Sequence, residues 1–224
     1  MNSLPVRTRA LSHALALGPW ALDAARDGRP YLFASVVHGP AVVLGQRQRA
    51  ARVIAWDDRG DTPLYRRATT GTAAYIARAA IVWTLALPRV STLLDDATPR
   101  TLLNRNVRVF LHGLNRAGAL AQYFGREWIA VRHRPCALLG FDLTRDGRVL
   151  LEMIAGWEGA IALPERLRSP HERALDRWRG TLPVSLAESV NDTWSAEKVA
   201  HTAIVAAAER AHQPLATLDG EPDG

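Results

Sequence analysis

The stretch Y-R-R-A-T-T-G-T-A-A-Y, from Tyr65 to Tyr75, decides how the rest of the sequence is interpreted. Arg66 and Arg67 follow a charged segment and run into small residues around Gly71. Planar guanidinium groups suit carboxylate or phosphate, and a glycine removes the Cβ that would keep a ligand away from the backbone. The stretch therefore predicts a loop that binds an anion. Taken alone, two arginines before a strand are more often a solvated sheet edge.

Composition limits the classes of protein that this chain can belong to. Its 224 residues, 48% of them hydrophobic, suit one globular domain. No apolar run reaches the length of a membrane span, and the N-terminus has no export signal, so we expect a cytoplasmic protein. A single cysteine, Cys136, excludes an intramolecular disulfide and a cysteine-rich metal site, and we expect no metal.

The positive charge is a weak argument for nucleic-acid binding. The formal net charge is +6, and only one lysine, Lys198, is present, so nearly all of this charge is arginine. The arginines are spread along the chain and form no block, and no segment interleaves aromatic and basic residues. We therefore expect no nucleic-acid partner, although a basic protein of that kind remains a third hypothesis.

The pattern of strands and helices predicts an α+β fold with a mixed, largely antiparallel sheet flanked by helices. Strands at 31–37 and 41–44 are expected to form a hairpin around His38-Gly39-Pro40, and strands at 137–142 and 149–154 a second one around a D-G turn. Further strands are expected at 80–87 and 128–131. Helices are expected at 92–120, 164–178 and from Ser195 onward, with short helical pieces at 11–17, 23–26 and 50–56 and a helical turn at 185–190.

The order of these features resembles the superfamily of lipoate–protein ligases, octanoyltransferases and biotin–protein ligases. The resemblance covers roughly residues 31–210, with residues 1–30 as an N-terminal extension, 31–212 as the ligase-like domain and 213–224 as a flexible tail. Members carry V-V-I-G-R-x-Q, which Val42 to Gln48 matches. They also carry G-R-N-D-L-V, and the segment from Gly125 to Ala130 is similar.

The family's pocket loop, R-R-x-S-G-G-G-A-V-Y-H, coincides with the opening stretch. The resemblance implies that the loop lines a pocket for an acyl group and its adenylate, together with the glutamine of the preceding motif. The ligand-binding residues that it implies are Gln48, Arg66, Arg67, Thr70, Gly71, Thr72, Ala73 and Tyr75. Thr70 and Thr72 stand in the places of two of the family's glycines, and Ile76 replaces its histidine.

The sequence departs from the family at the lysine that contacts the acyl carboxylate and phosphate. The corresponding run, R-H-R-P-C-A-L-L-G from Arg132 to Gly140, has no lysine, and Arg134 is the nearest cation. Arginine can neutralise an anion but is bulkier and planar, so Arg134 is a doubtful catalytic substitute. The cysteine nucleophile of the octanoyltransferases is also absent from its turn. Cys136 could be a thiolate beside arginines or, more commonly, a small buried hydrophobe.

Two hypotheses of function follow from the resemblance. The first is a lipoate–protein ligase-like protein that handles lipoyl or octanoyl groups for transfer to a lysine of a lipoyl carrier domain, with ATP and lipoate or octanoate as implied ligands. The second is a non-catalytic relative that binds an acyl ligand or a protein partner. The missing lysine and the altered loop favour the second, so the sequence leaves enzymatic activity open.

Overall fold

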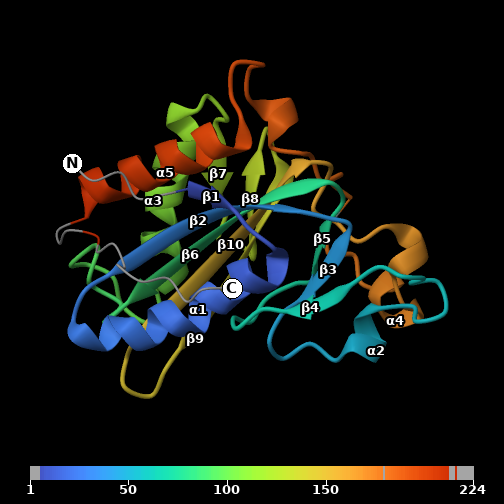
Figure 1. Cartoon of the computed structure of the whole chain (residues 1–224), viewed down its shortest axis with the longest axis horizontal. Helices are drawn as coiled ribbons and strands as arrows, with labels where there is room; N and C mark the ends of the chain where they lie inside the picture. The colour runs from blue at the N-terminus through green and yellow to red at the C-terminus, as the bar shows by residue number, and fades with distance from the viewer. Residues whose placement is uncertain (1–5, 179, 212–214, 216–224) are drawn as a thin grey trace.

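A large, mostly antiparallel sheet forms the centre of the computed structural model, which describes residues 6–178, 180–211 and 215 (Figure 1). Its strand order is β1-β2-β6-β10-β9-β8-β7, and only β1 and β2 run parallel. The bounds are β1 Val6–Thr8, β2 Tyr31–His38, β6 Ala79–Leu87, β7 Ala121–Tyr123, β8 Trp128–Val131, β9 Arg134–Leu143 and β10 Val149–Glu158. The predicted fold class and the β9–β10 hairpin are confirmed.

A second sheet of three strands lies beside the first, at the right of Figure 1. Its central strand β3 (Ala41–Leu44) is parallel to β4 (Leu64–Arg66) and antiparallel to β5 (Ala74–Ile76). The predicted hairpin of 31–37 with 41–44 is therefore wrong, because β2 pairs with β1 and β6 in the large sheet. The backbone donors and acceptors on the two edges of β3 are instead satisfied by β4 and β5, and all residues of β3 are buried in this small sheet.

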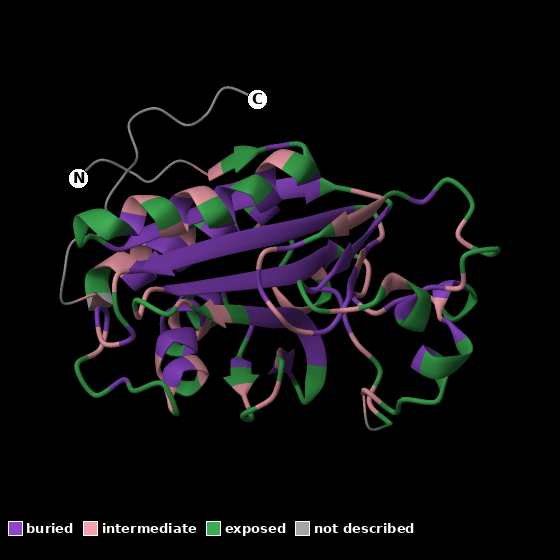
Figure 2. Ribbon diagram, turned by 90° about the horizontal axis from the view of Figure 1, so that it is seen from below, coloured by how far each residue is buried: buried purple, intermediate pink, exposed green. Residues whose placement is uncertain are grey.

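Helices cover both faces of the large sheet. On one face lie α3 (Leu102–Arg116) and α5 (Ala196–Arg210), and on the other lies α1 (Leu11–Ala24). Because strand side chains alternate, Trp83 and Leu85 of β6 face α3 and α5, whereas Val82 and Ala86 face α1. The central strands are buried between these layers (Figure 2).

Residues 6–30, expected to be an extension, are packed onto the domain. β1 pairs with β2, and α1 is one helix that runs through Pro19 and continues into a 3₁₀ turn, η1 (Ala25–Asp27). A Cβ on Gly18 would lie 2.9 Å from Oε1 of Glu152, so this glycine allows α1 to approach β10. The expected tail, 213–224, lies outside the described residues except for Leu215, which packs against the core.

Two expected helices differ from the structure. Residues 92–101 form turns, in which Thr98 and Thr101 exchange hydrogen bonds, before α3 begins. The predicted helix 164–178 is wrong, because the segment contains only η2 (Glu165–Leu167) and α4 (Pro170–Arg173), and the residues after α4 lack a continuous buried face. The short α2 (Ala50–Val53) and η3 (Ala187–Ser189) fall inside expected helical segments. The predicted cap of α5 is confirmed, since Ser195 Oγ accepts from Lys198 N at 3.2 Å.

Candidate functional site

The opening stretch forms β4, β5 and the glycine loop between them, which we define as residues 67–73. The loop lies over the middle of β9, where Thr70 N and Oγ1 donate to the carbonyl of Phe141 at 3.2 and 2.7 Å. Gly71 has a φ of 117°, and a Cβ there would lie 2.3 Å from Nη2 of Arg67 and 2.6 Å from the Leu139 carbonyl. Other groups thus approach the backbone of Gly71 closely, as the sequence predicted, and these groups belong to the protein itself.

Arg67 is fully buried beneath this loop. Its Nη2 donates to the carbonyls of Thr72 and Leu139 at 3.2 and 3.3 Å, while Nε and Nη1 have no partner. Burial lowers the pKa of Arg67, and the charges of Glu152 and Glu127 oppose that shift. Arg67 therefore supports the loop from below and offers no exposed charge to a ligand.

Glu152 of β10 is the buried carboxylate that accompanies Arg67, and it was not predicted as a site residue from the sequence. Its Oε2 accepts from Thr69 N at 3.1 Å and Oγ1 at 2.5 Å, whereas Oε1 has no partner. Burial raises the pKa of Glu152, and the Thr69 bonds and the Arg67 charge lower it. A glutamate inside the apolar run V-L-L-E-M-I was the signal available in the sequence, since isolated carboxylates are seldom buried without a role.

Arg66 is exposed and is used to hold a second loop. Its Nη1 donates to the carbonyls of Gly45, Gln46 and Gln48 at 2.9, 3.0 and 2.8 Å. Gln48 Oε1 in turn accepts from Gly45 N at 2.9 Å, and a Cβ on Gly45 would lie 2.2 Å from the Gly71 carbonyl. The two arginines expected to meet an anion thus anchor loop 45–48 and the glycine loop to each other and to β9.

An open cleft lies on the other side of the glycine loop, where it meets the start of β8. The cleft has a volume of about 380 Å³, and we name it the Thr72 cleft. Its lining residues are Thr72, Arg126, Glu127, Trp128, Leu175, Asp176 and Arg177. The glycine loop and the segment that is similar to G-R-N-D-L-V are therefore neighbours, and Thr72 Oγ1 donates to Glu127 Oε2 at 2.6 Å.

The charges that line the Thr72 cleft are balanced. Arg126 lies over the ring of Trp128, with Cζ 5.2 Å from the ring centre, and Trp128 in turn contacts Trp178 at 5.7 Å between ring centres. Arg126 and Arg177 face Glu127 and Asp176 around the cleft. This lining combines an apolar surface with one guanidinium, that of Arg126, which could meet a carboxylate.

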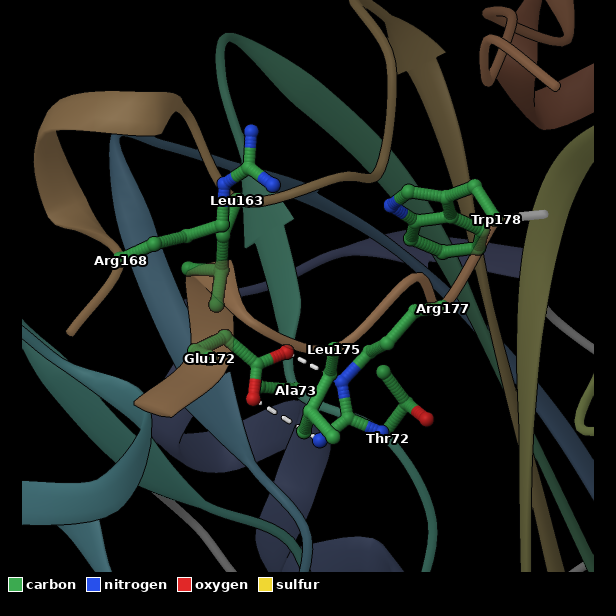
Figure 3. Close-up of a pocket in the computed structure, with 8 residues that line it drawn as sticks. All are labelled: Thr72, Ala73, Leu163, Arg168, Glu172, Leu175, Arg177 and Trp178. Atoms are coloured by element: carbon green, nitrogen blue, oxygen red, sulfur yellow. Dashed lines mark hydrogen bonds and ion pairs between the residues drawn. The ribbon is translucent and has the colours of Figure 1, made fainter. Parts of the chain in front are cut away.

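The space behind Thr72 and Ala73 is small, and Figure 3 shows the side chains that line it. Its volume is about 10 Å³, no more than a water molecule needs. Arg177 points toward Glu172 and binds both carboxylate oxygens, one of them at 2.8 Å, and this bonding raises the pKa of Arg177. Leu163 and Trp178 complete the lining. This ion pair was not predicted from the sequence, because it joins residues in the segment that was predicted to be one helix.

Tyr75 and Arg134, two further predicted site residues, do not line the Thr72 cleft. Tyr75 points to the opposite face of the small sheet from Ala74 and Ile76, where it packs near Val42. Arg134 begins β9, five residues before Leu139, so roughly 17 Å of strand separates them. Its guanidinium donates to the carbonyls of Leu182 and Pro183 at 3.0 and 3.4 Å. The Arg134 guanidinium therefore contacts residues of the segment before η3 and not the glycine loop.

Cys136 is a buried hydrophobe rather than a nucleophile. Its side chain is fully buried in β9, and burial raises the pKa of its thiol from 9.0 to about 12. We expect the native protein to react with a thiol reagent at pH 8 far more slowly than the unfolded protein, because the thiolate is the reactive form. Ellman's reagent with and without denaturant measures the difference, and equal rates would contradict this assignment.

The same shift predicts how stability depends on alkaline pH. The folded thiol keeps its proton above the pH at which the unfolded thiol loses it. The stability from the protonated form is therefore present below about pH 9 and lost as the pH rises toward about 12. A Cys136→Ala variant has no thiol to titrate and serves as the control. Its free energy of unfolding should therefore lack the decrease between about pH 9 and about pH 12 that comes from Cys136.

Metal ligands and membrane-spanning helices are not seen in the described part of the chain. No group of three or more His, Cys, Asp or Glu side chains there could hold a metal ion. Every helix within residues 6–178 and 180–211 is too short or too polar to cross a bilayer.

Comparison with known proteins gives matches to solved structures only. No family model matches the sequence, and no curated protein matches it. The structure is similar to that of LipL1 from P. falciparum in complex with lipoate, with a TM-score of 0.70 and 15% identity over 91% of this chain, and the chain spans 61% of the LipL1 chain.

Two further solved structures are similar over most of their own length. A bipartite lipoate–protein ligase from Thermoplasma acidophilum, studied with its E2 lipoyl domain, has a TM-score of 0.67 and 15% identity over 95% of this chain and 86% of the other. A lipoate–protein ligase A bound with ATP has a TM-score of 0.67 and 13% identity over 94% of this chain and 86% of the other chain. The chain therefore has the fold of the lipoate–protein ligases.

Proposed function

We propose that this is a lipoate–protein ligase-like protein that binds a lipoyl or octanoyl group in the Thr72 cleft and delivers it to a lysine of a lipoyl carrier domain. The observation that carries the proposal is the meeting of the glycine loop and the start of β8 in one cleft, on a fold shared with a lipoate complex. A cleft of about 380 Å³ is in the size range of small-ligand sites.

The lining residues have separate tasks in this proposal. Leu175 and Trp128 supply the apolar surface for the acyl chain, and the guanidinium of Arg126 binds its carboxylate. The hydrogen bond from Thr72 to Glu127 holds the two walls together. ATP, if used, would convert the carboxylate into a better acyl donor. Arg126 and Arg177 are the cations of the cleft, but Arg177 is already paired with Glu172.

A second candidate function, acyl binding without turnover, is favoured by a specific observation. The Arg177–Glu172 pair lines the small space behind Thr72 and Ala73, and Arg134 bonds to the carbonyls of Leu182 and Pro183. No lysine lies in these elements, since Lys198 belongs to α5. Such a protein would hold and present an acyl group, and its partner would carry out the chemistry.

One experiment separates the two candidates. Calorimetric titration with octanoate and lipoate measures binding, and incubation with ATP, labelled octanoate and an apo lipoyl domain measures transfer. Binding with transfer supports the ligase-like protein, and binding without transfer supports the non-catalytic relative. If neither acid binds with or without ATP, the Thr72 cleft is not an acyl site and both are wrong.

A charge on the apolar wall of the cleft should weaken binding. We expect Leu175→Glu to weaken octanoate binding about tenfold or more, because a carboxylate would be forced against the acyl chain. Leu182→Glu is the matched control, since Leu182 is 76% exposed and does not line the cleft. Calorimetry on both variants measures the difference, and an equal effect of the two substitutions would contradict this placement of the chain.

A further inference from the structure

A second cavity, on the far side of the Arg177–Glu172 pair, differs from the Thr72 cleft in charge. It has a volume of about 250 Å³ and lies between loop 45–49, α2 and α4. The charged groups around it are Arg47, Arg49, Arg52, His171 and the Arg177–Glu172 pair. We name it the arginine cavity. Four arginines thus face one carboxylate, whereas the charges of the Thr72 cleft balance.

The positive charge of this cavity is not neutralised within the described part of the chain. Glu172, the one carboxylate in the lining, is buried and has both oxygens bound to Arg177. The structure gives no hydrogen bond or ion pair for the guanidinium groups of Arg47, Arg49 and Arg52, or for the ring of His171. Three arginines from one short segment are therefore available to an anion.

The backbone that carries these arginines is held from both sides. Arg66 donates to the carbonyls of Gln46 and Gln48, on either side of Arg47. On the α2 side, Ser169 Oγ donates to the Arg52 carbonyl at 2.6 Å, and Ser169 N donates to the Val53 carbonyl at 3.0 Å. Ser169 also caps α4, so α2 and α4 are joined through one residue. Such anchoring lowers the entropy that the backbone would lose on binding a ligand.

We propose that the arginine cavity binds a phosphate-bearing anion of the size of pyrophosphate. Planar guanidinium groups bind phosphate oxygens in pairs, and several of them can share one group that carries more than one negative charge. The cavity is smaller than most sites for drug-sized ligands, and Val53 is the one apolar residue among the described residues that line it, so it suits a compact anion better than an acyl chain. The proposal does not depend on acyl binding in the Thr72 cleft.

The test is calorimetric titration of the full chain with pyrophosphate at low and moderate salt. We expect the double variant Arg47→Gln/Arg49→Gln to bind pyrophosphate at least about tenfold more weakly, because each charge-assisted contact contributes to affinity. The matched control is Arg145→Gln, an exposed arginine in the β9–β10 turn that lies outside the cavity. Both substituted arginines are exposed, and unchanged melting curves would show that the variants are folded.

Each outcome has a defined meaning. Selective loss in the double variant supports the site, and unchanged binding or an equal loss in Arg145→Gln overturns it. Citrate that binds as tightly as pyrophosphate would also overturn it, because the site would then bind any compact polyanion. With the site supported, equal affinity for ATP identifies a nucleotide as the source, and no affinity for ATP identifies a free anion. Intact octanoate binding with no pyrophosphate binding would overturn this inference alone.

Discussion

The variant Arg67→Met is expected to have a free energy of unfolding about 3–5 kcal/mol below that of the wild type, because it leaves a buried carboxylate without its counter-charge. Glu152 is fully buried, and the Arg67 charge is one of the contributions that lower its pKa. The substitution also removes the bonds from Nη2 to the carbonyls of Thr72 and Leu139. Denaturant unfolding followed by tryptophan fluorescence measures the loss.

The stability deficit of Arg67→Met, which is the amount by which its free energy of unfolding lies below that of the wild type, should depend on pH in a defined direction. Burial raises the pKa of Glu152, and removing Arg67 removes a contribution that lowers it. The folded variant then holds its proton to a higher pH than the unfolded chain does. The deficit is therefore smallest at acid pH and grows as the pH rises through the raised pKa. A deficit that is the same from acid to neutral pH would contradict this account.

A double variant separates the charge effect from a packing effect. In Arg67→Met/Glu152→Gln no buried charge remains, and the amide oxygen can still accept from Thr69. We expect the double variant to recover much of the stability that Arg67→Met loses. If the double variant loses as much free energy of unfolding as Arg67→Met and Glu152→Gln lose separately when added together, Arg67 and Glu152 do not interact.

The variant Gly113→Leu is expected to lower the free energy of unfolding by about 3 kcal/mol or more, because it forces two packed helices apart. Gly113 of α3 faces α5, and a Cβ there would lie 2.2 Å from Cα and 2.7 Å from Cβ of Ala203. The better helix propensity of leucine recovers about 1 kcal/mol at most. Thermal or denaturant unfolding measures the result.

The control places the same side chain on the exposed face of the same helix. Arg108 is exposed in α3, so Arg108→Leu should change stability by about 0.5 kcal/mol or less. If Gly113→Leu were as stable as Arg108→Leu, the two helices would not be packed as closely as the structure indicates.

Elements that depend on local signals were predictable from the sequence. The D-G turn identified the β9–β10 hairpin, and Ser195 identified the start of α5. The presence of Gly113 in α3 could not be explained from the local sequence, because the residue that it packs against, Ala203, lies on another helix. The pairing of β2 with β6 likewise could not be predicted from local sequence, because all three strands of the small sheet lie between β2 and β6 in the chain.

The chemistry of the glycine loop was only partly predictable. The sequence indicated a loop around Gly71 whose backbone is closely approached, but not that Thr72 of this loop would contact Glu127 at the start of β8. The different uses of Arg66 and Arg67 could not be predicted, because one residue of separation decides which guanidinium enters the interior. Arg134 was proposed because it is the nearest cation in the run that corresponds to the family's lysine motif, and in the structure its guanidinium bonds to the carbonyls of Leu182 and Pro183.

The central place of β6 has a consequence for how this chain folds during synthesis. β6 pairs with β2 on one edge and with β10 on the other, and every residue of β6 is buried in the finished sheet. As the chain leaves the ribosome, β2 is ready before β6, but β10 is made only after α3 and three further strands. Until then β6 has an unpaired apolar edge, which is the kind of surface that chaperones protect and that aggregates form from. Translation speed between residues 88 and 148 is thus expected to influence the yield of folded protein.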